Sequence, residues 1–306
     1  MKKIRVCFMV LISLFLFNLN SSIKADRGSI PFRPHVRILE PNQNAILAWN
    51  GREEIMALTT DLRATGKTKV LQVLPLPSEP KVKRGSLRSF RRAIHIINRH
   101  LIRRARYKYG RYGRRSRGGG RRIPAGKVTF SKKIGSHDIA VTKVLNSKGF
   151  VTWVQNYIKS KGHKKVVIPG PLKRVVMEYI SDGFKWFVFD IVELDTKKVT
   201  NDVIEYRFKT RFLYYPLRIT RTETGYTRVK LIILTPYLFR SRDFKGVPFR
   251  KIRLPHYPVR ISNTELRAIN RDIYSLFKRR RYYNLRVWHI YGRLNNFEKD
   301  LLCSKK

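Results

Sequence analysis

The sequence predicts an α+β protein in which antiparallel-rich sheets carry about four helices and one long basic loop. Short apolar runs are separated by turn residues, as at Asn50-Gly51. A few longer segments repeat apolar residues at helical spacing. Strands and helices come in blocks and do not alternate strictly, which argues against a doubly wound parallel sheet. A hydrophobic fraction of 42% is enough for a packed core.

The first section of the mature chain has the pattern of β-structure. Asn50-Gly51 lies between two short apolar runs and predicts a hairpin, because both residues tolerate a positive φ. The proline cluster at 75–80 should end the last strand of this section, since proline cannot donate to a strand ladder. The strands expected here cover 36–39, 45–49, 55–58 and 70–76.

A long basic helix is predicted over 87–106. Its apolar residues, including Phe90, Ile94 and Ile97, recur at steps of three and four and therefore share one face. Arginines occupy the other faces. The following segment, 107–122, is rich in Tyr, Gly and Arg and has too few apolar residues to pack, so we expect a disordered basic loop there.

The remainder of the chain mixes strands with shorter helices. Ser262 and Glu265 form a capping-box pattern in front of an apolar helical repeat, which marks the start of a helix. Residues 236–258 are rich in Pro, Arg and aromatics and predict a loop with short edge strands. The expected strands are 128–130, 139–144, 184–194, 203–213, 227–234 and 285–291, and the expected helices lie at 150–158, 172–180, 262–277 and 297–302.

The N-terminus has the pattern of a secretory signal peptide. Lys2 and Arg5 belong to a basic start, an apolar stretch over 6–17 follows, and a polar segment leads to Ala25. The apolar stretch is shorter than the roughly 20 residues that a transmembrane helix needs. We expect cleavage after residue 25, and an uncleaved membrane anchor is the alternative.

The expected mature chain, 26–306, is interpreted as a single exported α+β region. A subdivision near 145–170 is the alternative. After cleavage Cys303 is the only cysteine, so the mature chain has neither an internal disulfide nor a cysteine-rich metal site. Its stability must then come from the core.

The charge of the chain is its most unusual property. Lys and Arg total 67 against 20 Asp and Glu, which gives a formal net charge of +47. Such a charge attracts nucleic acid, anionic lipid or acidic polymers. The alternative interpretation is a general drift toward basic surfaces, because net charge alone does not specify a partner.

Sequence motifs for catalysis or metal binding do not withstand inspection. Ser136-His137-Asp138 are consecutive and point alternately to opposite faces of a strand, so they cannot converge as a triad. His95 and His100 are five apart and lie on different sides of a helix. Gly66-Lys67-Thr68 lacks the upstream glycine of a phosphate-binding loop. We therefore assign no catalytic, cofactor-binding or metal-binding residue.

The acid-free stretch 80–137 is the one functional signal. It contains 20 Lys or Arg residues and neither Asp nor Glu. Arginine offers bidentate hydrogen bonds to phosphate, sulfate or carboxylate, and tyrosine offers a stacking face. An exposed, solvated loop without a ligand is the alternative. The residues expected to contact a polyanion are Arg103, Arg104, Arg106, Tyr107, Lys108, Tyr109, Arg111, Tyr112, Arg114, Arg115, Arg117, Arg121 and Arg122.

Several short segments, in this order along the chain, resemble an exported prokaryotic family, domain of unknown function 2330. The resemblance implies export and a shared core, and it brings no known activity, cofactor or catalytic residue. The basic loop matches no motif of that family. The segments that carry the resemblance are 26–28, 40–51, 59–62, 73–78, 134–139 and 212–217.

Together these observations predict an exported, non-enzymatic protein without a cofactor, whose basic helix and loop contact a polyanion. The candidate partners are an anionic cell-envelope surface, an acidic glycan or extracellular nucleic acid. One alternative is an extracytoplasmic hydrolase whose site is assembled from residues distant in sequence. A second alternative is a nucleic-acid-binding protein, which suits the charge and conflicts with the signal peptide.

Overall fold

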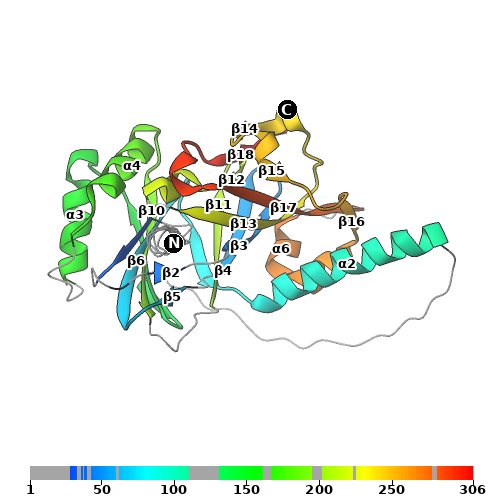
Figure 1. Cartoon of the computed structure of the whole chain (residues 1–306), viewed down its shortest axis with the longest axis horizontal. Helices are drawn as coiled ribbons and strands as arrows, with labels where there is room; N and C mark the ends of the chain where they lie inside the picture. The colour runs from blue at the N-terminus through cyan, green and yellow to red at the C-terminus, as the bar shows by residue number, and fades with distance from the viewer. Residues whose placement is uncertain are drawn as a thin grey trace, which may run out of the picture.

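The computed structural model describes residues 28–32, 36, 38–39, 43–59, 62–109, 131–160, 167–194, 202–222, 225–277 and 281–305. Two large sheets pack against each other, and helices cover the outer face of each one, so the predicted α+β class is confirmed. Figure 1 shows α3 and α4 at one end of the molecule and α2 at the other.

The five-stranded sheet has the order β1-β6-β10-β9-β8, with antiparallel pairs throughout. The expected strand over 70–76 is confirmed as β6, which begins at Thr68 and continues through Pro75 to Leu76. The strand bounds are β1 Gly28–Pro31, β6 Thr68–Leu76, β8 Ser131–Ile134, β9 His137–Lys143 and β10 Trp186–Leu194.

The eight-stranded sheet has the order β15-β17-β13-β3-β4-β11-β7, and β16 also pairs with β17. Its β13–β3 pair is parallel and the other pairs are antiparallel. The predicted hairpin is confirmed: Gly51 has a φ of 103°, and the Asn50 side chain accepts hydrogen bonds from two following backbone N–H groups. The bounds are β3 Gln43–Trp49, β4 Glu53–Thr59, β7 Lys81–Arg84, β11 Val203–Lys209, β13 Tyr226–Thr235, β15 Ile252–Arg253, β16 Val259–Ile261 and β17 Tyr283–Arg293.

The expected helix over 297–302 is wrong. The segment Leu301–Cys303 forms strand β18, which pairs with β12 (Leu213–Tyr215) on one side and with β14 (Phe244–Gly246) on the other. It is the middle strand of this three-stranded sheet, and the strand geometry buries Leu301 and Cys303 while Leu302 stays partly exposed. The short strands β2 (Ile38–Leu39) and β5 (Arg63–Ala64) form a separate pair.

Five α-helices lie within the described residues. Helix α2 ends three residues beyond the expected position 106, so residues 107–109 of the expected loop are helical, and 110–122 lie outside the described residues. The predicted capping box of Ser262 and Glu265 is confirmed. The helical bounds are α2 Leu87–Tyr109, α3 Ser147–Ser160, α4 Gly170–Ser181, α5 Asn263–Ile269 and α6 Arg271–Leu276, with 3₁₀ turns at Arg218–Thr222, Ser241–Asp243, Phe249–Lys251 and Leu294–Asn296.

The single helix expected over 262–277 is in fact two short helices. Asn270 separates them with an extended backbone, and its side chain accepts hydrogen bonds from the N–H groups of Asp272 and Ile273 at the start of α6. Asparagine favours this capping position over a helix interior because its side chain competes for backbone groups. The apolar repeat continues on both sides of the break, which is why periodicity alone did not show it.

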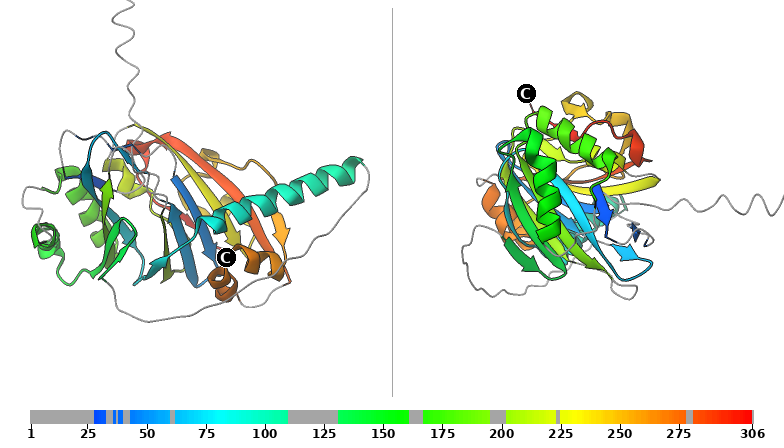
Figure 2. Two further views of the ribbon diagram at one scale, coloured as in Figure 1. Left: turned by 90° about the horizontal axis from the view of Figure 1, so that it is seen from below. Right: turned by 90° about the vertical axis from the view of Figure 1, so that its left-hand side faces the viewer.

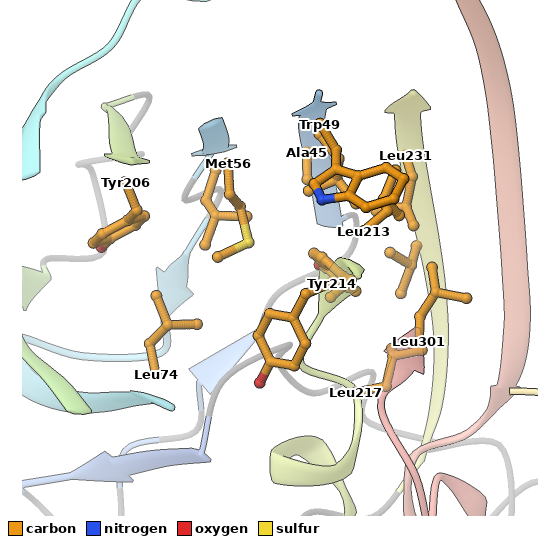
Figure 3. Close-up of a cluster of buried hydrophobic side chains, with 14 of the residues drawn as sticks. Ala45, Trp49, Met56, Leu74, Tyr206, Leu213, Tyr214, Leu217, Leu231 and Leu301 are labelled. Carbon is orange, nitrogen blue, oxygen red and sulfur yellow. The ribbon is translucent and has the colours of Figure 1, made fainter. Parts of the chain in front are cut away.

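The core lies between the sheets. Leu74 and Val188 of the five-stranded sheet share one cluster with Trp49, Met56 and other residues of the eight-stranded sheet. Figure 3 shows Tyr214, from β12, projecting into this cluster between Leu74 and Leu301. Helices α3 and α4 cover the outer face of the five-stranded sheet, and α2, α5 and α6 cover that of the eight-stranded sheet.

A buried carboxylate, Asp300, joins the last part of the chain to this core. It accepts hydrogen bonds from the hydroxyl of Tyr179 at 2.6 Å, the backbone N–H of Arg218 at 2.8 Å and the hydroxyl of Tyr214 at 3.4 Å. The Arg218 guanidinium lies 3.9 Å from the centre of the Tyr179 ring and donates to the exposed Asp182. Burial raises the pKa of Asp300 above its usual value, although these hydrogen bonds oppose the shift. We call these residues the Asp300 cluster.

No helix among the described residues is long and apolar enough to cross a membrane. Helix α2 is the longest of them and carries many arginines. It crosses the outer face of the eight-stranded sheet, and its C-terminal turns extend past the sheet edge (Figure 2).

Candidate functional site

Some of the predicted polyanion-binding residues lie on α2, and the others lie outside the described residues. Arg103 and Arg104 are exposed on the projecting half of α2, and the Arg104 guanidinium lies 5.0 Å from the centre of the Tyr257 ring. Residues 106–109 are part of the helix. The other predicted residues, Arg111, Tyr112, Arg114, Arg115, Arg117, Arg121 and Arg122, lie outside the described residues.

One flank of α2 uses its cations to hold the neighbouring helix. Arg92 donates a hydrogen bond to the Ala268 carbonyl at 2.6 Å, and Arg99 and His100 both contact the Glu265 carboxylate. Burial opposes ionisation of Glu265, but the Ser262 backbone, His100 and Arg99 outweigh it and hold the pKa below its usual range. These basic residues therefore have a structural role.

The opposite flank of α2 faces an open groove. Leu87, Arg91, Ile94, His95 and Asn98 occur at spacings of three and four and so lie on one side of the helix. Because Arg92 and Arg99 point to the other flank, the helix divides the sheet face between a packed side, with α5 and α6, and an open side (Figure 2).

The eight-stranded sheet supplies the other wall of the groove. Register places Lys230 of β13 beside Asn44 of β3, and Asn44 opposite Thr59 of β4, so these three polar residues lie in one line across the strands. The cavity measures about 490 Å³. We call it the basic groove, and its lining consists of Asn44, Thr59, Leu87, Phe90, Arg91, Ile94, His95, Asn98, Lys230 and Ile232.

The line of polar residues continues beyond the groove toward the edge of the sheet. His289 of β17 pairs with Lys230, and Arg253 of β15 pairs with His289. With adjacent strands about 4.8 Å apart, Arg253, His289 and Lys230 place three basic side chains within roughly 10 Å. We call these three residues the cation row.

A tyrosine is packed between two arginines next to the cation row. The guanidinium groups of Arg228 and Arg253 lie 5.4 and 5.3 Å from the centre of the Tyr291 ring. The Tyr291 hydroxyl is 3.2 Å from Nδ1 of His289. This packing holds the arginine side chains over the sheet face, where their heads remain available to an anion.

The charged side chains of the groove and the cation row are basic, without acidic neighbours among the groove-lining residues. Burial lowers the pKa of His289, and the positive charges of Lys230, Arg228 and His256 lower it further. No Asp or Glu lines the groove. Among the described residues, none forms an ion pair with Arg91, Arg228, Lys230 or Arg253.

The Ser136-His137-Asp138 sequence does not form a triad, as expected. Nδ1 of the buried His137 is 2.7 Å from Oδ2 of the buried Asp190 on the neighbouring strand β10. The Ser136 hydroxyl donates instead to Asp202 at 3.2 Å. Serine and histidine thus have separate carboxylate partners, and the histidine is sealed within the sheet.

The described residues contain no cluster of three or more His, Cys, Asp or Glu side chains that could hold a metal ion. Cys303 is buried in β18, and burial raises the pKa of its thiol well above the usual value. A buried thiol of this kind is neither a reactive nucleophile nor a metal ligand.

Fold and site together define a layered α+β protein with an open, cation-lined groove on one sheet face. The chain belongs to the family described as uncharacterized protein conserved in bacteria (DUF2330), whose model matches residues 28–246. The match includes α2, β3, β4 and β13, which form the groove, and it ends before β15 and β17, which carry the outer part of the cation row. The resemblance predicted from short segments is therefore confirmed.

No curated protein matches the chain in sequence. Among solved structures, baculovirus P35 is similar over 90% of this chain and 100% of its own, with a TM-score of 0.43 and 9% identity. P35 after caspase cleavage matches with a TM-score of 0.38 and 8% identity, over 87% of this chain and 99% of its own. The matched chain of the caspase-8/P35 complex has a TM-score of 0.33 and 9% identity, over 89% of this chain and 97% of its own. At these TM-scores the likeness carries no functional inference.

Sequence reasoning identified only the helix side of this site, and only as a region. Arg91 and His95 lie in the acid-free stretch 80–137 but not among the residues expected to contact a polyanion, which all lie at 103–122. Lys230, Arg253 and His289 were missed. A signal for part of the sheet side was present, because Arg228 and Lys230 alternate with the apolar Val229 and Leu231 and therefore share one face of the strand.

Proposed function

We propose that this is an exported, non-enzymatic protein that binds polyanions through the basic helix α2 and the adjoining sheet face. The observation that carries the proposal is the cation row, which strand register assembles. Its inner member, Lys230, lines the groove together with Arg91 and His95 of α2, and no acidic side chain lines that groove. A linear polyanion lying across the strands would meet several cations in succession.

The physical basis of such binding is the release of counter-ions from the polyanion. Each phosphate or sulfate that a Lys or Arg neutralises frees condensed salt, so affinity falls steeply as salt rises. Like-charged neighbours also repel one another in the free protein, and a bound anion relieves that repulsion. Both effects concentrate at the groove because its cations have no acidic partners among the described residues.

The lining of the groove favours binding over catalysis. It contains one histidine, His95, and neither a serine, a cysteine nor a carboxylate lines it. A hydrolase needs a nucleophile or an activated water with a base and an oriented partner. The alternative of an extracytoplasmic hydrolase therefore gains no support from this cavity.

Export is supported by the basic, apolar and polar sequence of residues 1–25 and by the Ala25 cleavage position. N-terminal sequencing of the protein recovered from the cell envelope or medium tests it directly. A mature start at Asp26 supports export. An intact Met1 on protein found only inside the cell would favour the alternative of a cytoplasmic nucleic-acid-binding protein.

Polyanion binding is tested by the salt concentration at which the protein elutes from a sulfated-glycan column. Because the whole chain is basic, the test needs variants of equal charge change. The triple variant Arg91→Gln, Lys230→Gln, Arg253→Gln removes cations from the site. The control, Arg211→Gln, Lys245→Gln, Arg250→Gln, removes three exposed cations from elsewhere on the chain.

We expect the site variant to elute at clearly lower salt than the control, and its logarithmic salt dependence to be shallower by roughly 0.7–0.9 for each lost contact. Equal elution of the two variants would contradict the proposal. Single-stranded DNA and anionic vesicles, tested in parallel, identify the class of polyanion. Deletion of 107–122 measures how much the predicted loop residues contribute to column binding. We expect this deletion to lower the elution salt further when it is combined with the site variant.

A further inference from the structure

The basic groove contains more apolar surface than a polyanion can use. Leu87, Phe90, Ile94 and Ile232 form part of its lining, next to the cationic side chains of Arg91 and Lys230. Leu87 is 36% exposed although it begins the helix that packs on the core. A sulfated or phosphorylated chain would contact the cations and leave the exposed Leu87 and the half-buried Ile94 in water.

The apolar side of the groove continues along α2. Leu87, Ile94 and Leu101 recur every seven residues, which is close to two helical turns, and all three are only partly buried. They form a narrow apolar track that leads from the groove toward the projecting end of the helix. Arg91 and Asn98 lie beside this track on the same side of the helix.

The size and polarity of the cavity suit a small amphiphilic molecule. Pockets for small ligands measure about 300–1,000 Å³ and combine an apolar lining with a few polar groups that fix orientation. The 490 Å³ groove has this composition, because cationic and amide side chains line it together with aliphatic ones. No acidic lining residue is present to repel an anionic head group.

We propose that the basic groove binds an anionic amphiphile, in which one hydrocarbon chain carries a phosphate or carboxylate head group. The head group lies at Arg91 and Lys230, and the amides of Asn44 and Asn98 supply further hydrogen bonds. The hydrocarbon chain lies along Leu87 and Ile94. This site shares the groove with the proposed polyanion surface, and it does not depend on polyanion binding being correct.

Calorimetric titration of the purified protein tests the two halves of the ligand separately. Dodecyl phosphate and dodecanoate, below their micelle concentrations, carry both halves. Inorganic phosphate carries the head group alone, and dodecyl maltoside carries the chain on a neutral head. Burial of about four methylene groups corresponds to roughly 100-fold in affinity, so we expect dodecyl phosphate to bind at least that much more tightly than inorganic phosphate.

Two variants assign the ligand to the groove. Arg91→Gln with Lys230→Gln should weaken dodecyl phosphate by at least about tenfold and leave dodecyl maltoside unaffected. Ile94→Gln, which retains helix propensity, should weaken both alkyl ligands and leave inorganic phosphate unaffected. Thermal unfolding confirms that each variant is folded, and Arg211→Gln with Lys245→Gln is the control of equal charge.

Three outcomes would overturn the proposal: equal affinities for dodecyl phosphate and inorganic phosphate, equal affinities for dodecyl phosphate and dodecyl maltoside, or unchanged dodecyl phosphate binding in the folded Ile94→Gln protein. The sulfated-glycan column separates this proposal from the previous one. If the protein binds the amphiphile but the site and control triple variants elute at the same salt, the amphiphile site is supported and the polyanion surface is contradicted. The reverse result retains only the polyanion surface.

Discussion

The Asp300 cluster and the cation row differ in how their charged side chains are placed and paired. Asp300 is buried and accepts hydrogen bonds from two tyrosine hydroxyls and a backbone N–H. Lys230, His289 and Arg253 are aligned at a half-open surface among other cations. The carboxylate is satisfied by the fold itself, whereas the cations find no acidic partner among the described residues.

This difference extends to the rest of the described chain. The buried charged residues apart from histidine are all acidic: Glu54, Asp190, Glu205, Asp243 and Asp300. Every Lys and Arg whose side-chain exposure the structure describes is at least partly exposed. The surface is therefore even more positive, relative to its acids, than the composition suggests, because a share of the few carboxylates is used inside the protein.

The largest effect on stability should come from disrupting the Asp300 cluster. Asp300→Ala leaves two buried donors, the Tyr179 hydroxyl and the Arg218 N–H, without an acceptor, while the Tyr214 hydroxyl keeps the Pro75 carbonyl. At about 1–3 kcal/mol for each lost acceptor, we expect a loss of about 2–5 kcal/mol in the free energy of unfolding. Urea denaturation measures it. The control is Asp182→Ala, which removes the exposed partner of Arg218 and should cost below about 1 kcal/mol. Similar losses in both variants would show that the cluster is not a buried unit.

A smaller change within the same cluster tests one hydrogen bond. Tyr179→Phe retains the ring under Arg218 and removes only the hydroxyl that donates to Asp300 at 2.6 Å. We expect a loss of about 1–2 kcal/mol in unfolding free energy by urea denaturation. Tyr157→Phe on α3 is the matched control, because that ring is only partly buried. If the Tyr179→Phe protein is as stable as the parent, the hydrogen bond between Tyr179 and Asp300 does not contribute to stability.

Substitutions in the cation row should not lower the stability of the protein. Lys230→Gln with Arg253→Gln reduces repulsion in the cation row, so the unfolding free energy should stay constant or rise by up to about 0.5 kcal/mol at low salt. The same protein should bind the sulfated-glycan column more weakly. Loss of stability together with loss of binding would mean that these cations support the fold and are not a ligand site.

The smallest effect concerns pH. His289 faces Lys230, Arg228, Arg253, Tyr291 and His256, and its pKa lies below the usual 6.5. Because the folded protein resists protonating it, stability should fall slightly as pH drops below about 6.5. A bound polyanion favours the protonated ring, so column retention should rise a few-fold as pH falls from 7.5 to 5.5. His289→Gln should flatten this rise, and an unchanged rise in that variant would assign it to another group.

Local patterns predicted much of the fold. The hairpin at Asn50-Gly51, the periodic helix α2 and the capping box at Ser262 are set by neighbouring residues, and all three are confirmed. The strand Leu301–Cys303 was mistaken for a helix because its partners, β12 and β14, are remote in sequence. Three apolar residues in a row give no periodicity that distinguishes the two states.

The site was harder to predict for the same reason. The acid-free stretch around Arg91 is visible in the sequence as a run. The cation row is assembled only by strand pairing, because His289 and Lys230 are far apart along the chain and become neighbours through register. No single segment of the sequence carries that information.

The length of α2 has a consequence for the ligands that this surface would select. Arg91 borders the basic groove, and Arg103 is exposed twelve positions later on the same rigid helix, which corresponds to roughly 18 Å. An oligomer shorter than this span reaches one of the two positions, whereas a longer one reaches both, and its second contact forms at a high effective concentration. If the proposed polyanion binding is correct, affinity should therefore increase abruptly with oligomer length, and the helix would favour long anionic chains over their short fragments.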